Sequence, residues 1–214
     1  MFTSNERVLI LSPHTDDAEL GCGATISKFV AAGVDIFWIC FSTAEDSLPD
    51  GFPEDALKKE FKQVLNFLKI SDDNSLVLNY RVRKLSEVRQ EILDILVKTR
   101  NSFQPNIVIG PSLNDFHQDH QVVANEMIRA FKSSASIISY ELPWNHVDFK
   151  TQLFSKIDES DLQKKVEMLS FYKTQHVAKR YYFNDEFITG LARVRGTQVN
   201  NPFAEAFEVI RWQI

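Results

Sequence analysis

Short apolar runs alternate with amphipathic segments along the first two thirds of the chain. The runs predict buried strands at residues 7–12, 34–42, 106–110 and 135–140, and a shorter strand at 75–78. Between them, apolar side chains recur at helical spacing, which predicts helices at residues 23–32, 54–69, 87–99 and 119–131. Strands that alternate with helices are typical of a mostly parallel sheet with helices on both faces. We therefore expect an α/β fold.

The pattern changes after Pro143. Strands near residues 149–157 and 207–213 and a helix at 160–172 are expected there, but they do not continue the alternation. The chain contains no linker rich in glycine, proline or serine, and no internal repeat. We expect a single domain over residues 1–214 with a small C-terminal extension.

Charge and composition favour some binding partners and some cell compartments over others. Of the 214 residues, 24 are Lys or Arg and 29 are Asp or Glu, so the net charge is -5 and a nucleic-acid partner is disfavoured. No apolar run is long enough to span a membrane, and the first residues do not resemble a signal peptide. The two cysteines, Cys22 and Cys40, read most simply as free thiols in a reducing compartment. We expect a cytoplasmic protein without a membrane partner, and a homo-oligomer stays open.

The chemistry-bearing residues gather in two loops that follow predicted strands. The first loop carries His14, Asp16, Asp17 and Glu19, and the second carries Asp115, His117, Asp119 and His120. Because the carboxyl ends of parallel strands share one edge of a sheet, the two loops can meet. Two imidazoles and a carboxylate suit a divalent transition metal such as zinc, which needs three protein ligands and an open position for water. The remaining acids and imidazoles would supply a general base and an oxyanion stabiliser.

Two other interpretations of the first loop carry less weight. Acidic loops after strands are often solvated turns, and Asp16 or Asp17 would then cap the next helix. Gly21 and Gly23 resemble part of a dinucleotide-binding fingerprint, but Ile26 occupies the place of its third glycine. The acids that precede these glycines would also repel a pyrophosphate.

At these residues the sequence resembles the LmbE-like, or PIG-L, family of zinc-dependent N-acetylglucosaminyl de-N-acetylases. The family motifs His-Pro-Asp-Asp-x-Glu and His-Pro-Asp-His stand here as HTDDAE at 14–19 and HQDH at 117–120. Thr15 and Gln118 replace the prolines, which supply no ligand. Further familial segments are Gly-Cys-Gly at 21–23, Lys-Thr-Gln at 173–175 and Ala-Glu-Ala-Phe at 204–207. The resemblance implies a Rossmann-like fold.

The resemblance also implies a role for each motif residue. It makes His14, Asp17 and His120 the zinc ligands. It makes Asp16 the general base and His117 the group that, when protonated, faces the oxyanion, while Asp119 orients a histidine. Glu19 is expected to have only a structural role. The implied reaction is hydrolysis of the N-acetyl group of an N-acetylglucosamine-type sugar conjugate, a small-molecule substrate, by water activated at the metal.

Two alternatives to the deacetylase remain open. A metal-dependent hydratase or lyase acting on a small unsaturated acid would use the same ligands, and a non-catalytic metal module would need neither Asp16 nor His117. No role is assigned to Arg81, Arg83, His146 or His176. One departure bears on the sugar: Leu57 stands one turn before Glu60, where many relatives carry an arginine.

Overall fold

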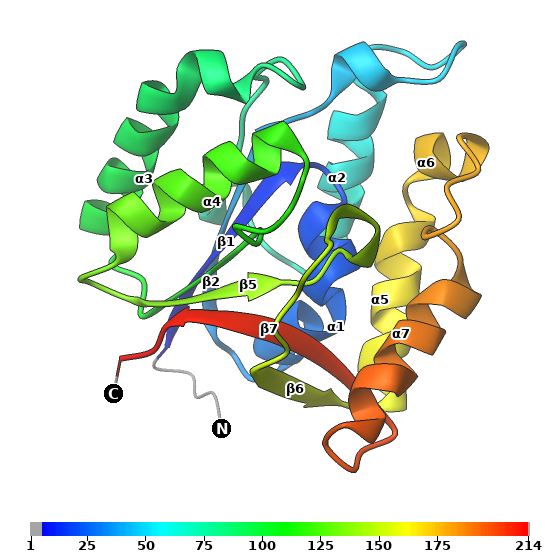
Figure 1. The fold of residues 1–214 in the computed structure, drawn as a ribbon. Coiled ribbons are helices and arrows are strands. Elements are labelled where there is room, and N and C mark those ends of the chain that lie inside the picture. The colour runs from blue at the N-terminus through cyan, green and yellow to red at the C-terminus, as the bar shows by residue number, and fades with distance from the viewer. Residues whose placement is uncertain (1–5, 214) are drawn as a thin grey trace.

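Five parallel strands form the centre of the fold in this computed structural model, which describes residues 6–213 (Figure 1). They are β1 (Arg7–His14), β2 (Asp35–Ser42), β3 (Ser75–Val77), β4 (Ile107–Gly110) and β5 (Ser136–Tyr140). The sheet has the order β3-β2-β1-β4-β5-β7-β6, and its first five strands follow the order of a doubly wound sheet. The expected α/β class is confirmed.

The segment after Pro143 lengthens this sheet. Strand β7 (Phe203–Arg211) pairs antiparallel with β5, and β6 (Leu153–Ile157) pairs antiparallel with β7. Strand β7 begins four residues before the predicted 207, because Phe203 to Phe207 pair along the whole of β6. The expected C-terminal extension is therefore built into the sheet.

Helices cover both faces of the sheet (Figure 1). One face carries α1 (Asp17–Ala31), α2 (Ala56–Phe67), α5 (Glu159–Ser170), α6 (Lys173–Val177) and α7 (Asp185–Thr197). The other face carries α3 (Arg89–Phe103) and α4 (Gln118–Phe131). Each layer buries its own apolar cluster against the sheet, the first around Trp38 and Phe61 and the second around Phe41 and Phe131.

Helix α7 was not predicted from the sequence. Its buried positions are Ile188, Ala192 and Gly196, spaced four residues apart, and Asn184 caps its start by accepting the Phe187 N–H at 2.7 Å. The apolar stripe is narrow and holds two small residues, so the helical periodicity is weak. A capping Asn followed by two acids was the signal available in the sequence.

Helix α1 begins at Asp17, six residues before the predicted start, and it is broken at Cys22, whose φ and ψ are -149° and 25°. Below the break, the Glu205 carboxylate accepts hydrogen bonds from the Ala24 and Thr25 N–H groups at 3.2 and 2.7 Å. Glu205 also pairs with the buried Lys165 at 2.7 Å. Glu205 thus caps the second half of α1. The first turn of α1 can therefore have a different axis and start directly after β1.

The glycine before the break permits close packing. A Cβ atom at Gly21 would lie 2.5 Å from Cδ2 of Tyr140, so no larger residue fits between α1 and β5.

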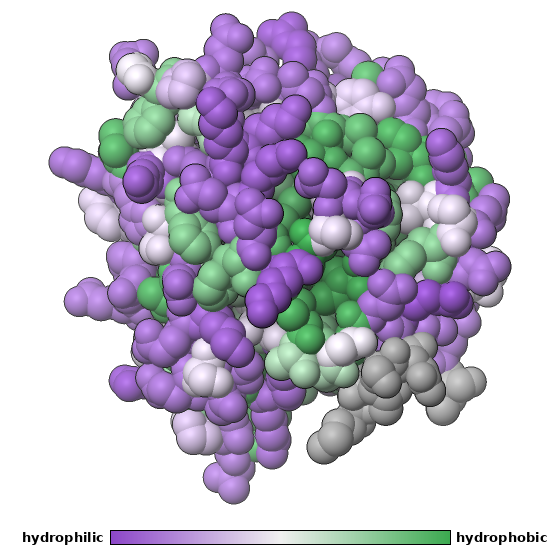
Figure 2. Space-filling view, turned by 180° about the vertical axis from the view of Figure 1, so that it is seen from behind, coloured by the Kyte–Doolittle hydropathy of each residue, from purple (hydrophilic) through white to green (hydrophobic). Residues whose placement is uncertain are grey.

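The outer surface is mainly polar. In the view from behind, hydrophilic residues dominate and apolar residues gather in a smaller area near the middle (Figure 2). Within residues 6–213, no helix has the length and apolar character that a membrane span requires. Cys22 and Cys40 are both buried free thiols, as expected.

Candidate metal centre

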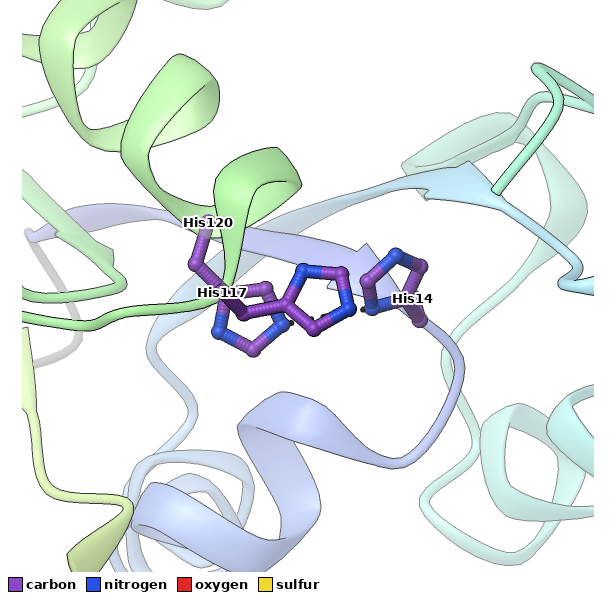
Figure 3. A group of neighbouring side chains, drawn as sticks. All are labelled: His14, His117 and His120. Carbon is purple, nitrogen blue, oxygen red and sulfur yellow. Dashed lines mark hydrogen bonds between the residues drawn. The ribbon is translucent and has the colours of Figure 1, made fainter. Parts of the chain in front are cut away.

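The two motif loops meet between β1 and β4, where the order of the strands in the sheet reverses. From β1 the chain proceeds to β2 on one side, and β4 lies on the other side, so the β1/β4 edge is the switch point at which ligands bind in such sheets. His14 is the last residue of β1, and His117 and His120 stand at the start of α4. Figure 3 shows their three imidazoles gathered at the end of β1.

Three donor atoms form a nearly equilateral triangle at this edge. Asp17 Oδ2 lies 3.2 Å from His14 Nδ1 and 3.2 Å from His120 Nε2. The two imidazole nitrogens are also 3.2 Å apart. With zinc–ligand bonds of about 2.0–2.1 Å, the edges of a tetrahedral site are about 3.3 Å long. The residues present therefore fit a tetrahedral metal ion without rearrangement.

The three imidazoles are a second, looser set. The donor atoms of His14, His117 and His120 lie within 4.8 Å of one another. His117 Nδ1, however, already accepts the Asp119 N–H at 3.2 Å, as the cap of α4. The tighter triangle therefore fits a metal better than the three histidines do.

Each imidazole of the triangle has its outward nitrogen within hydrogen-bond distance of a carboxylate. His14 Nε2 lies 2.9 Å from Asp119 Oδ2, and His120 Nδ1 lies 2.7 Å from Asp115 Oδ2. Such partners fix the ring orientation and increase the basicity of the inward nitrogen. Asp119, which the resemblance expects to orient a histidine, contacts His14. The sequence analysis placed Asp115 in the loop but gave it no role.

Backbone donors fix both carboxylates in turn. Asp119 accepts the N–H groups of Arg83 and Leu85 at 2.5 and 3.2 Å, and Asp115 accepts the N–H of His117 at 2.8 Å. Arg83 contributes its backbone here, while its side chain is exposed and lines no part of the site.

The electrostatics of the triangle favour a cation. Burial alone would raise the pKa of Asp17, but His120 and His14 hold it well below its usual range. Burial would lower the pKa of His120, yet Asp17 and Asp115 raise it to about 10. Without a metal, the buried carboxylates thus retain a proton on His120, and a metal ion can take the place of that positive charge.

Asp16 stands beside the triangle in a strained conformation. Its φ of 80° lies in the left-handed region, which is costly for a residue other than glycine and is concentrated at functional sites. Its side chain makes no capping bond to α1, so the helix-cap interpretation is wrong for Asp16. Burial, with the charges of Asp17 and Glu19, raises the pKa of Asp16 well above its ordinary value.

His117 faces the same space as a neutral donor. Burial and the neighbouring His120 and His14 lower its pKa to about 4. Since Nδ1 accepts the Asp119 N–H, the proton of the neutral ring is on Nε2. His117 can therefore donate a hydrogen bond as a neutral ring, whereas the resemblance implied a protonated one.

A cavity of about 280 Å³ opens over these groups. Beyond the motif residues, its walls include Leu57, Trp144, Gln175, Arg180 and Tyr182. Sequence reasoning missed the last two, which come from the segment between α6 and α7, far from both motifs. Trp144 lies in the turn after β5.

The remaining candidate residues lie outside the cavity. Glu19 is buried and accepts the Tyr172 hydroxyl at 2.5 Å, which agrees with a structural role. Arg81 pairs with Asp46 on the surface at 3.1 Å. His176 Nε2 lies 3.3 Å from the Leu169 carbonyl. His146 packs behind the site, with Nε2 4.0 Å from Asp115 Oδ2.

Leu57, the residue noted above as a departure from the family pattern, lines the cavity. Glu60, one turn later, is turned away from it, accepting the N–H and hydroxyl of Thr174 at 3.1 and 2.6 Å. The pair joins α2 to α6, and thereby supports the segment that carries Arg180 and Tyr182.

Comparison with known proteins identifies the class. The PIG-L family, described as GlcNAc-PI de-N-acetylase, matches residues 9–131, a span that holds both motifs. The chain belongs to this family, and the expectation drawn from the motifs is confirmed. It is accordingly a hydrolytic N-deacetylase of a metal-dependent family.

Individual relatives agree with this class. The chain is 25% identical to the uncharacterized deacetylase YaiS of Escherichia coli K12 over 80% of its own length and 94% of that protein. It is 29% identical to diacetylchitobiose deacetylase of Thermococcus kodakarensis, over 56% of this chain and 47% of that protein. Among solved structures, the inhibitor complex of N,N'-diacetylchitobiose deacetylase from Pyrococcus horikoshii has a TM-score of 0.77 at 20% identity, covering 96% of this chain and 84% of that one. At that identity the likeness establishes the fold alone.

Proposed function

We propose that the chain removes the N-acetyl group from an N-acetylglucosamine-type sugar conjugate, with zinc held by His14, Asp17 and His120. The observation that supports this most is the triangle of three donor atoms, each 3.2 Å from the other two. Beside it stands Asp16, which has a strained backbone and makes no capping hydrogen bond to α1. The reaction class follows from the family and the relatives. The type of sugar is inferred from the substrates of the family and of diacetylchitobiose deacetylase.

Zinc would lower the pKa of a water molecule to about 7 and polarise the acetamide carbonyl. Asp16 takes a proton from the attacking water, a role that suits a carboxylate whose pKa burial and neighbouring charges raise well above its ordinary value. His117 donates its Nε2 proton as a hydrogen bond to the oxygen that becomes negative as the tetrahedral intermediate forms. Asp16 then delivers its proton to the departing amine, so that acetate and a free amine leave the site.

Asp119 and Asp115 act through the two histidines. Each holds an imidazole in the tautomer that presents its inner nitrogen to the metal, and each is itself fixed by backbone N–H groups. Neither carboxylate is expected to touch the substrate.

Amide hydrolysis is preferred over addition of water to a carbon–carbon double bond, because the family is one of de-N-acetylases. Single-domain organisation, a cytoplasmic location and assembly into a homo-oligomer stay predictions of the sequence.

The test is a comparison of the metal-free and zinc-loaded protein on the methyl glycoside of N-acetylglucosamine and on diacetylchitobiose. We expect acetate and primary amine in equal amounts, and only from the zinc-loaded protein. A parallel reaction with a small unsaturated dicarboxylic acid, followed by ultraviolet absorbance, tests the hydratase alternative. Loss of the double bond there, without amine release from either sugar, would overturn the proposal.

A further inference from the structure

Arg180 lines the catalytic cavity beside an aromatic stack. Its neighbour Tyr182 stacks on Trp144, with ring centroids 3.8 Å apart and planes 6° from parallel. Trp144 belongs to the turn after β5, so the stack fastens the α6–α7 segment to the sheet side of the cavity. All three side chains line the cavity that contains Asp16 and His117.

Among the described residues, the Arg180 guanidinium forms no close ion pair, although its charge acts on the nearby Asp16 carboxylate. Within residues 6–213 no carboxylate forms an ion pair with it, and its Nε makes one long hydrogen bond, 3.4 Å, to Gln175 Oε1. By contrast, Arg195 pairs with Glu141, and Arg81 pairs with Asp46. Most of the five N–H donors of Arg180 thus remain available, in a planar arrangement that matches a carboxylate or a phosphate.

The rest of the cavity wall offers no other permanent positive charge. Outside the metal motifs, the lining side chains among the described residues are uncharged except for Arg180: Leu20, Ala44, Ser47, Leu57, Val82, Trp144, Asn145, Gln175 and Tyr182. Leu57 and Val82 leave one side of the cavity apolar. A negative group on a bound substrate would therefore find one complementary partner, away from the metal triangle.

We propose that Arg180 binds an anionic group, a carboxylate or a phosphate, on the part of the substrate beyond the N-acetylated sugar. The inference rests on the proposed function, because it assumes that this cavity holds the sugar. It predicts a substrate of different charge from diacetylchitobiose, the neutral sugar named for two of the similar proteins. Arg180 would be a specificity-determining residue, with no part in the proton transfers.

Three substrates with the same sugar separate charge from sugar recognition. They are the neutral methyl glycoside of N-acetylglucosamine, the carboxymethyl glycoside and the 1-phosphate. With the zinc-loaded protein, we expect kcat/KM to be higher for at least one charged substrate than for the methyl glycoside. In Arg180→Met the ratio of charged to neutral kcat/KM should fall roughly tenfold, through KM, because a charge-assisted hydrogen bond is lost. Arg180→Lys keeps the charge and should restore part of the ratio.

Lys179→Met is the matched control, because Lys179 is exposed, adjacent in sequence and not part of the cavity wall. It should leave the ratio as in the parent protein. The carboxymethyl and phosphate substrates show which anion is preferred. If Arg180→Met reduces kcat for charged and neutral substrates equally, Arg180 acts on the neighbouring Asp16 and the proposal is wrong. A parent protein that favours the neutral glycoside overturns it too.

Calorimetric binding of the same three compounds separates this inference from the proposed function. Should no substrate release an amine, the deacetylation proposal fails. The role of Arg180 is then decided by affinity alone: weaker binding of the charged compounds relative to the methyl glycoside in Arg180→Met supports it, and an unchanged relative affinity rejects it.

Discussion

Asp17 Oδ2 lies 3.2 Å from His120 Nε2, although the two residues begin helices on opposite faces of the sheet. Helix α1 leaves the end of β1 toward one face, and α4 follows β4 toward the other (Figure 1). Only at the shared edge of β1 and β4 can the two helix starts approach each other. The metal site is thus a consequence of the strand order.

The contact predicts which substitutions release the metal. Asp17→Ala and His120→Ala should lose stoichiometric zinc after dialysis, because each removes one corner of the triangle. His117→Ala should keep it, since His117 Nδ1 is occupied by the cap of α4. Elemental analysis of the dialysed proteins measures the metal content. Zinc retained by Asp17→Ala but lost by His117→Ala would assign the site to the three histidines instead.

Asp16→Asn is expected to separate metal binding from turnover. The asparagine keeps the size of the side chain but cannot accept a proton, so kcat should fall about 10²- to 10⁴-fold with zinc content unchanged. Single-turnover release of amine from the methyl glycoside is the measurement. Turnover at the parent rate would show that another group is the base.

The sequence was sufficient to predict the parallel strands and the edge of the sheet at which the site lies, because both depend on local hydrophobic pattern and on strand order. Alternating strands and helices defined the parallel strands, and the position of His14 and His120 after two of them was enough to bring both to one edge. What the sequence could not predict depends on side-chain direction. Asp115 lies in an acidic loop, and only the structure shows its Oδ2 facing His120.

Long-range packing explains the other omissions. Trp144 and Tyr182 are far apart in sequence, and each alone reads as an ordinary core aromatic. The early start of α1 was missed because the break at Cys22 is stabilised by Glu205, from the last strand. Neither relationship leaves a periodic signal in the neighbouring sequence.

The buried Glu205–Lys165 pair is expected to be strongly coupled. Glu205→Gln would leave the Lys165 ammonium buried without its counter-charge and should lower the free energy of unfolding by about 3–5 kcal/mol. The double variant Glu205→Gln/Lys165→Met should recover part of this loss, because no unpaired charge remains. Urea unfolding of the parent, of the single variants Glu205→Gln and Lys165→Met, and of the double variant completes the cycle.

An exposed pair is the control for this cycle. Asp55 and Lys59 lie 2.8 Å apart on the surface of α2, and Asp55→Asn should cost less than about 1 kcal/mol. Equal losses in Asp55→Asn and Glu205→Gln, or a double variant no more stable than Glu205→Gln, would contradict the strong coupling of Glu205 and Lys165.

We expect His146 to make the free energy of unfolding depend on pH, in a direction that follows from the burial of its ring. Burial lowers the pKa of His146 below its ordinary value of about 6.5, and the charge of His120 lowers it further. Nearby carboxylates raise this pKa but do not outweigh burial. The carboxylates are Asp115, Glu208 and Glu141. Below about pH 6.5 the unfolded chain therefore binds a proton that the folded chain does not, so the free energy of unfolding falls as the pH decreases toward the folded pKa.

Replacing His146 by phenylalanine should reduce this fall in the free energy of unfolding at low pH. Neither ring nitrogen of His146 has a hydrogen-bond partner among the described residues, and the ring stacks on Phe149 with centroids 5.0 Å apart, so His146→Phe keeps the packing and loses no hydrogen bond. Between about pH 7 and pH 5 the metal-free variant should lose less stability than the metal-free parent, as urea unfolding at each pH measures. Parallel losses in the two proteins would mean that His146 is protonated in the folded chain, with Asp115 as its partner.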